Sequence, residues 1–310
     1  MAARDPSYLA LHRTGELRRR AQTLVAALES CELCPRACGV NRLQHERGYC
    51  RSGRRAKVSS FGPHFGEEAP LVGHGGSGTI FLTNCNLLCI FCQNCEISHL
   101  SEGAEVAPER MAEMMLSLQK RGCHNINFVT PTHFVPQIVE ALDVAAAQGL
   151  RLPLVYNCGG YESVETLKLL EDVFDIYMPD AKYSSSEAAE QLSGAPDYPE
   201  RMQESIREMH RQVGDLELDD RGIAVRGLLV RHLVLPNGLA GTQEAMEFLA
   251  SLSQNTYVNV MAQYRPCYRA GEVQAIARRI TSGEFQEALR MALEAGLTRL
   301  DDRRARVLLF

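Results

Sequence analysis

The chain has 310 residues, 45% of them hydrophobic and 23% charged, and a formal net charge of −5. These values are typical of a globular protein with a sizeable core and exclude a largely disordered chain. Basic residues form no long block, and no stretch is apolar enough to span a bilayer, so we expect neither nucleic acid nor membrane as a partner. The stretch 1–20 has no apolar core of the kind found in signal peptides, and we therefore expect a cytoplasmic protein.

The first part of the chain combines an amphipathic pattern with a cysteine cluster. Hydrophobic residues at helical spacing predict a leader helix over 7–29. The stretch 31–50 follows, with four cysteines and little apolar content. Residues 59–78 are rich in Gly, Pro and His and are expected to form a loop.

From residue 79 onward, apolar runs alternate with helical patterns, which is typical of parallel strands joined by crossover helices. The expected strands are 79–84, 125–130, 153–158, 173–183, 227–236 and 256–264. A hairpin over 216–226, with its turn at Asp219–Gly222, precedes the fifth strand. Six units are too few to close an eight-stranded barrel, so we expect an α/β fold with an open, partial (β/α)6 barrel. The expected divisions are 1–58, 59–270 and 271–310.

A group of cysteines follows the first expected strand, 79–84. The chain has eleven cysteines, and the loop CNLLCIFCQNC carries Cys85, Cys89 and Cys92 in the spacing C-x3-C-x2-C. An iron–sulfur cubane needs one ligand for each of its four irons, so three thiolates on one loop leave one iron open to an outside ligand. Zinc or a disulfide is the alternative, and closed zinc would need a fourth protein ligand, which Cys95 could supply.

At these residues the chain resembles the radical S-adenosylmethionine (radical SAM) superfamily. The segments GPHFGEEAPLVG, GSGTIFLTNCNL, YNCGGYE and CELCPRACGVNR are similar to the pyruvate formate-lyase activating enzyme-like branch. The resemblance implies a radical SAM barrel in which Cys85, Cys89 and Cys92 hold a [4Fe-4S] cluster. Its open iron would bind the amino and carboxylate groups of S-adenosylmethionine. One electron from the cluster would then yield methionine and a 5′-deoxyadenosyl radical, which takes hydrogen from a substrate.

The resemblance also implies partners. A reductant such as flavodoxin or ferredoxin would supply the electron. The substrate stays open between the loop of a glycyl-radical enzyme, another protein or peptide, and a small molecule. A non-catalytic iron–sulfur or zinc scaffold is the alternative of a different class.

Further positions at the strand ends match cofactor-binding positions of the superfamily. Thr130 and Thr132 stand where activating enzymes have Gly-Gly-Glu, and an ordinary turn is the alternative there. Asp180 and Lys182 fit the pattern Met-x-Asp-x-Lys and alternate to one face of a strand, which an internal ion pair would also explain. The remaining positions that the resemblance assigns to S-adenosylmethionine are Asn157, Gly159, Gly160, Arg231 and Tyr264, with Gln263 beside the last.

The leader cysteines form a second group. Cys31, Cys34, Cys38 and Cys50 have the spacing C-x2-C-x3-C-x11-C. Four thiolates suit tetrahedral zinc, and by ligand type they suit an auxiliary iron–sulfur cluster equally well. Because the segment is poor in apolar residues, metal binding would largely stabilise its fold. We favour a structural metal over a redox relay, and free structural cysteines are the alternative.

Overall fold

The computed structural model describes residues 5–301. Its centre is an open sheet of nine strands in the order β3-β1-β2-β4-β5-β6-β8-β7, with β9 paired to β8. The strands are β1 (Ala56–His64), β2 (Ser77–Leu82), β3 (Ala104–Val106), β4 (Ile126–Val129), β5 (Leu154–Cys158), β6 (Ile176–Pro179), β7 (Glu217–Leu218), β8 (Ala224–Leu233) and β9 (Tyr257–Met261). Neighbours from β2 through β4, β5, β6 and β8 to β9 pair in parallel. The expected mixed α/β architecture with six parallel strands is therefore confirmed.

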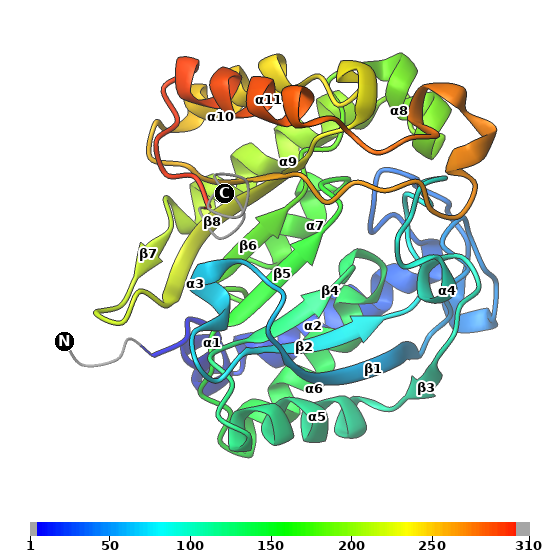
Figure 1. Ribbon diagram of the computed structural model, residues 1–310. Helices are drawn as coiled ribbons and strands as arrows, with labels where there is room; N and C mark the ends of the chain where they lie inside the picture. The colour runs from blue at the N-terminus through cyan, green and yellow to red at the C-terminus, as the bar shows by residue number, and fades with distance from the viewer. Residues whose placement is uncertain (1–4, 302–310) are drawn as a thin grey trace.

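Helices connect these strands and flank the sheet (Figure 1). The α-helices are α1 (Tyr8–Thr14), α2 (Glu16–Ala26), α3 (Ala69–Val72), α4 (Cys95–Ser98), α5 (Pro108–Lys120), α6 (Val135–Ala147), α7 (Val164–Leu169), α8 (Ser186–Ser193), α9 (Tyr198–Val213), α10 (Thr242–Leu252) and α11 (Ser282–Glu294). Short 3-10 turns are η1 (Ala27–Ser30), η2 (Arg42–Gln44), η3 (Thr132–Phe134), η4 (Pro236–Gly238), η5 (Ala270–Glu272) and η6 (Gln274–Ile276). In Figure 1, α5 and α6 lie below the sheet, and α10 and α11 lie above it.

Local sequence explains where several elements begin. Pro108 occupies the first turn of α5, where its missing N–H costs no hydrogen bond. The Ser163 side chain accepts a hydrogen bond from the Thr166 N–H and caps α7. Every residue of β5 and β6 is buried, as expected for central parallel strands covered on both faces.

Two predicted elements were wrong. The stretch 59–78 is not all loop, because β1 pairs antiparallel with β2 along its length, and α3 follows. Gly62 and Pro63 weaken the strand pattern in the sequence, but pairing with β2 stabilises the strand β1. The leader helix over 7–29 is two helices, α1 and α2, separated by Gly15 at φ 77°. The predicted hairpin is present, and Gly222 N–H closes its turn on the Asp219 carbonyl.

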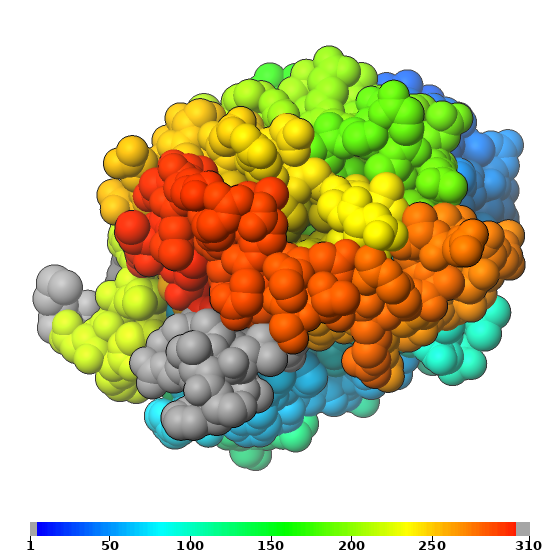
Figure 2. All heavy atoms as spheres, turned by 45° about the horizontal axis from the view of Figure 1, so that its top comes forward, coloured from blue at the N-terminus to red at the C-terminus, as the bar shows by residue number. Residues whose placement is uncertain are grey.

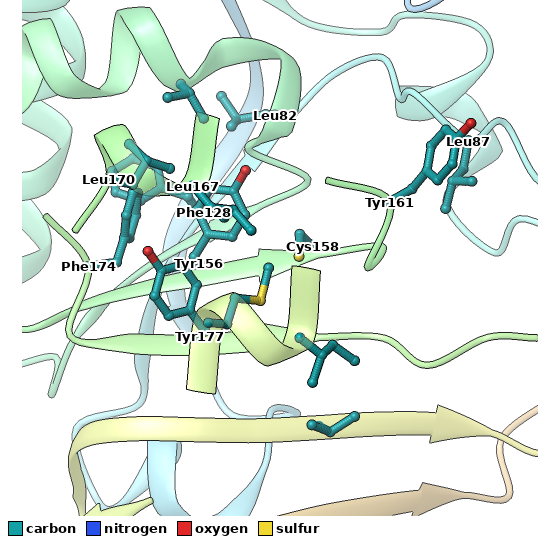
Figure 3. Packing of buried hydrophobic residues seen from close by; sticks show 14 of the residues in the cluster. Leu82, Leu87, Phe128, Tyr156, Cys158, Tyr161, Leu167, Leu170, Phe174 and Tyr177 are labelled. Atoms are coloured by element: carbon teal, nitrogen blue, oxygen red, sulfur yellow. The ribbon is translucent and has the colours of Figure 1, made fainter. Parts of the chain in front are cut away.

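An aromatic cluster fills the core under the parallel strands (Figure 3). The ring centroids of Tyr156 and Phe174 lie 4.9 Å apart, and those of Tyr156 and Tyr177 lie 5.7 Å apart. The Tyr177 hydroxyl donates to the Gln212 side chain at 2.7 Å, which satisfies its polar end. These strand positions are therefore held rigidly beneath the loops that follow them.

The two ends of the described chain pack onto the barrel. The Tyr8 hydroxyl of α1 donates to the Leu152 carbonyl at 3.1 Å, and His12 lies 2.7 Å from Asp143 of α6. The C-terminal segment, orange to red in Figure 2, lies against the yellow segment that contains η4 and α10. The boundaries at 58 and 270 stay predictions, and residues 1–4 and 302–310 of the outer divisions lie outside the described part. No helix within residues 5–301 has the length and apolar character to cross a membrane.

Candidate functional site

A cavity of about 670 Å³ lies at the carboxyl ends of the parallel strands. Most of the residues proposed from the sequence line it, namely Cys85, Cys89, Cys92, Thr130, Asn157, Gly159, Asp180, Lys182 and Arg231. They come from loops after β2, β4, β5 and β6 and from strands β5 and β8 themselves. The structure thus brings together side chains that are spread over almost 150 positions of the chain, roughly as expected for a strand-end site.

The cysteine loop folds back over the end of β2. Asn84 and Leu88 adopt left-handed φ values of 68° and 54°, and the Asn84 N–H donates to the Ile97 carbonyl at 2.8 Å. These turns direct Cys85, Cys89 and Cys92 into the cavity.

Polar groups already contact the three sulfur atoms. The Leu87 N–H donates to Cys85 Sγ at 3.3 Å, and the Ser193 hydroxyl donates to Cys89 Sγ at 3.0 Å. Cys92 Sγ lies 3.2 Å from the Ser98 hydroxyl. Donors to sulfur stabilise the thiolate, the form that ligates metals. Burial acts the other way and raises the pKa of Cys85 to about 12. A bound metal ion would favour the thiolate.

A charged network lies opposite the cysteines. Arg231 Nε donates to Asp180 Oδ1 at 2.7 Å, and one terminal nitrogen of Arg231 donates to the Asn157 side chain at 2.7 Å. Lys182 Nζ donates to the other Asp180 oxygen at 2.5 Å. Burial alone would raise the pKa of Asp180, but Arg231 and Lys182 hold it below its usual value. The network holds two cations and one carboxylate, so Lys182 and Arg231 are placed to bind an anionic ligand group.

Two glutamates that the sequence did not single out also line this cavity. Glu67 Oε2 lies 4.0 Å from an Arg231 nitrogen, and burial next to Glu68 raises the pKa of Glu67 to about 7. Glu68 Oε1 accepts a hydrogen bond from the Asn259 amide at 2.8 Å, whereas its Oε2 is buried with no hydrogen-bond partner among residues 5–301. The two adjacent acidic residues in the segment GEEAP could have suggested a functional site. Their position at the cavity, however, is set by β1 and α3, which the sequence analysis did not predict.

Three residues proposed from the sequence do not line the cavity. Thr132 is buried and donates to Glu162 Oε1 at 2.8 Å. Gly160 lies against the Asp180 carbonyl. The Tyr264 hydroxyl donates to the Ile276 carbonyl at 2.7 Å, away from the cavity, while the neighbouring Gln263 does line it.

The leader cysteines surround a second, much smaller cavity of about 10 Å³. Cys31, Cys34, Cys38 and Cys50 line it together with His133 of η3. Within residues 5–301, no three His, Cys, Asp or Glu side chains converge closely enough to hold a single metal ion.

Comparison with known proteins assigns the family. The model of the radical SAM superfamily matches residues 79–216. An uncharacterized protein of Methanocaldococcus jannaschii, MJ0674, is 34% identical over 284 residues, which cover 88% of this chain and 77% of that protein. The chain belongs to the radical SAM superfamily. Radical SAM enzymes use an iron–sulfur cluster and S-adenosylmethionine, so this chain is expected to act as an enzyme. The match begins within β2 and includes the cysteine loop.

The main cavity fits the two groups that a radical SAM protein binds. Three thiols from one loop face it, as a cluster with one open iron requires. Arg231 and Lys182 suit a carboxylate. Glu68 Oε2 and Asn84 Oδ1 are buried and have no hydrogen-bond partner in the described part of the chain, so they can accept N–H groups of a ligand. The donor set therefore matches an amino acid head group beside a cluster.

Proposed function

We propose that this protein is a radical SAM enzyme whose cysteine loop holds a [4Fe-4S] cluster through Cys85, Cys89 and Cys92. The single observation that supports this most strongly is that the three thiols share one cavity with the Asp180, Lys182 and Arg231 network. The bound cluster and S-adenosylmethionine would together supply a 5′-deoxyadenosyl radical for hydrogen abstraction.

The protein's own residues would position the cofactor. Lys182 and Arg231 would bind its carboxylate, while Asp180 keeps both cations in place through hydrogen bonds on its two oxygens. Glu68 Oε2 and the strand-end backbone at Thr130 would accept hydrogen bonds from its amino group. Asn157 and Gly159 line the same wall as further contacts.

The substrate is proposed only by class. A protein or peptide loop, including that of a glycyl-radical enzyme, is the substrate that the resemblance to activating enzymes suggests, and flavodoxin or ferredoxin would be the reductant. Transfer of deuterium from a labelled candidate into 5′-deoxyadenosine would identify the substrate, and a product without deuterium would eliminate that candidate.

The central test is cleavage of S-adenosylmethionine. Anaerobically reconstituted protein, reduced with dithionite, should form 5′-deoxyadenosine and methionine, measured by chromatography. Because each thiol ligates one iron, Cys85→Ala, Cys89→Ala or Cys92→Ala should each reduce the rate by at least about 100-fold.

Cys95→Ala provides the matched control, because Cys95 lies three positions after Cys92 but does not line the cavity. It should retain nearly the full rate. A reconstituted protein with a reducible cluster that neither binds nor cleaves S-adenosylmethionine would instead support a non-catalytic iron–sulfur scaffold.

A further inference from the structure

A series of contacts connects the cysteine loop with the protein surface at α4. Cys92 Sγ lies 3.2 Å from the hydroxyl of the buried Ser98, and Ser98 Oγ lies 2.8 Å from Nδ1 of His99. The His99 ring packs on Tyr268, with 4.3 Å between the ring centroids. Because Tyr268 is 46% exposed, these contacts run without a break from solvent to a thiol that lines the main cavity.

Three segments that are far apart in the chain meet at this place. Arg51, which follows the leader cysteines, donates to the His99 carbonyl at 2.6 Å. The backbone N–H of Arg269 donates to the Ile90 carbonyl of the cysteine loop at 2.9 Å. In Figure 1, α4 and the orange segment that leads to η5 both lie on the right-hand side of the molecule. The surface around Tyr268 is therefore attached to the backbone of the cysteine loop.

This surface combines exposed apolar side chains with positive charge. Leu100, which follows His99, is 63% exposed, and Arg51 and Arg269 are exposed as well. Burial lowers the pKa of His99, and the charges of Arg51 and Arg269 lower it further, so both charges lie close to its ring. Glu272 lies 2.7 Å from Arg269 and offsets part of its charge, whereas Arg51 donates to uncharged carbonyls.

A positively charged surface of this kind selects an acidic partner. The chain has a formal net charge of −5, so an acidic protein is repelled on average and needs a local positive site to approach. Exposed apolar side chains bordered by polar ones mark protein–protein contact sites. Encounters between redox proteins have small interfaces, and complementary charge guides them. Next to a cluster ligand, such a surface suits a small acidic electron carrier.

We propose that the exposed side chains around His99 form a docking surface for an acidic one-electron carrier protein. The docking surface consists of Arg51, Leu100, Tyr268 and Arg269. The carrier is oxidised by one electron and the cluster is reduced by one electron, with the contacts of His99 and Ser98 leading to Cys92. No atom is transferred. The proposal rests on the [4Fe-4S] cluster proposed above and adds the place at which the electron enters.

Reduction of the cluster by two different reductants tests the docking surface. Cluster-loaded wild type, Arg51→Glu and Arg269→Glu are mixed anaerobically with reduced flavodoxin or with dithionite, without S-adenosylmethionine, and the loss of cluster absorbance is followed. Each charge reversal should slow reduction by flavodoxin about 10-fold at low salt, because attraction becomes repulsion. Reduction by dithionite, a small molecule that needs no docking surface, should change by less than about 2-fold.

Arg290→Glu is the matched control, because it reverses the charge of an exposed arginine on α11, outside the docking surface. It should leave both rates unchanged. Equal slowing with both reductants would mean that Arg51 and Arg269 only support the cysteine loop, and unchanged flavodoxin rates would mean that the carrier docks elsewhere. Either result overturns the proposal, as does a wild-type cluster that neither flavodoxin nor ferredoxin reduces.

Tyr268 has a separate readout. Tyr268→Ala removes the exposed ring that packs on His99 and should slow reduction by flavodoxin about 10-fold, since aromatic side chains dominate protein contacts. Its rate should still fall with added salt, because both arginines remain. Leu293→Ala, which shortens an exposed apolar side chain on α11, should not slow reduction. Equal rates for Tyr268→Ala and wild type would contradict the path through His99.

The same measurements separate the docking surface from the proposed enzyme. A cluster that flavodoxin reduces with the expected dependence on Arg51 and Arg269, but that does not cleave S-adenosylmethionine, would support the docking surface and overturn the enzyme. Cleavage driven by dithionite, together with flavodoxin rates that are independent of both arginines, would have the reverse meaning.

Discussion

Gly160 shows how one missing side chain allows two strand ends to meet. It has a φ of +77°, and a Cβ placed there would lie 2.2 Å from the Asp180 carbonyl oxygen. The Tyr198 hydroxyl contacts this junction, at 2.9 Å from the Gly159 carbonyl and 2.8 Å from that of Asp180. The backbone position of Asp180, and with it the charged network, therefore depends on glycine at position 160.

This dependence predicts a large difference between two glycine substitutions. Gly15 has the same φ of +77°, but a Cβ placed there would have no atom of the described residues within 4 Å. Gly15→Ala should lower the free energy of unfolding by about 1 kcal/mol, which is the backbone cost alone. Gly160→Ala adds a collision with backbone and should cost roughly 3 kcal/mol or more. Denaturant unfolding of both variants measures the difference, and equal losses would contradict the role given to Gly160.

Residue types alone predicted much of the candidate site. Two local patterns indicated it, namely the spacing of Cys85, Cys89 and Cys92 and the alternation of Asp180 with Lys182. Such patterns can be recognised in the sequence because they do not depend on how distant elements pack. Glu67 was not singled out, and Tyr264 was proposed but does not line the cavity, for a different reason. Whether each side chain faces the cavity depends on a neighbouring element, α3 for Glu67 and η6 for Tyr264, which sequence spacing does not describe.

At the level of elements, the leader segment is joined to the cysteine loop by one arginine. Arg36 donates to the carbonyls of Asn86, Ser193 and Gly194, and its guanidinium lies 3.8 Å from the centre of the Tyr49 ring. Ser193 also donates to Cys89, so one side chain connects the leader, α8 and the loop.

Removing Arg36 should therefore loosen the loop. Arg36→Ala leaves carbonyls without their charged donor and should cost about 2 kcal/mol of unfolding free energy. Hydrogen exchange in residues 84–92 should become faster. Arg290→Ala on α11, which removes only exposed ion pairs, should have a much smaller effect on stability and leave that exchange unchanged. Unchanged exchange in Arg36→Ala would argue against the connection.

Strongly patterned elements were predicted well, and β1 was not. The parallel strands are continuous apolar runs, which only a buried strand or helix explains. In β1, the sequence lacks a clear strand pattern because it contains Gly62 and Pro63 and has a half-exposed face. Its extended conformation is stabilised by pairing with β2. Tertiary pairing, rather than local preference, decides such a segment.

At the scale of the whole molecule, one buried carboxyl group links stability to pH. Glu162 is 3% exposed and accepts hydrogen bonds from Tyr156 and Thr132, with Cys158 also beside it. Burial raises the pKa of Glu162 from 4.5 to about 7. The folded protein therefore binds this proton more tightly than the unfolded chain does. Its contribution to stability is complete below pH 4.5 and is lost as the pH rises toward 7.

Glu162→Gln should remove this pH dependence. Between pH 5 and pH 8 the wild type should lose up to roughly 3 kcal/mol of unfolding free energy relative to the variant. The comparison cancels the parallel effect of Glu67, whose pKa is raised as well. Unfolding curves of both proteins at several pH values and equal metal content measure this difference. If the unfolding free energies of the two proteins change in parallel with pH, Glu162 does not titrate in this range.

The antiparallel pairing of β1 with β2 also protects the protein in solution. Unpaired backbone groups at the edge of a sheet invite other chains to add as further strands. Here β1 covers β2, while Val258 of β9 is paired at the opposite edge by Arg299 and Asp301. A recombinant fragment restricted to residues 79–216 would uncover β2 and β6 and would be prone to aggregate. Residues 56–64 and 299–301 therefore cover the two outer edges of the parallel part of the sheet.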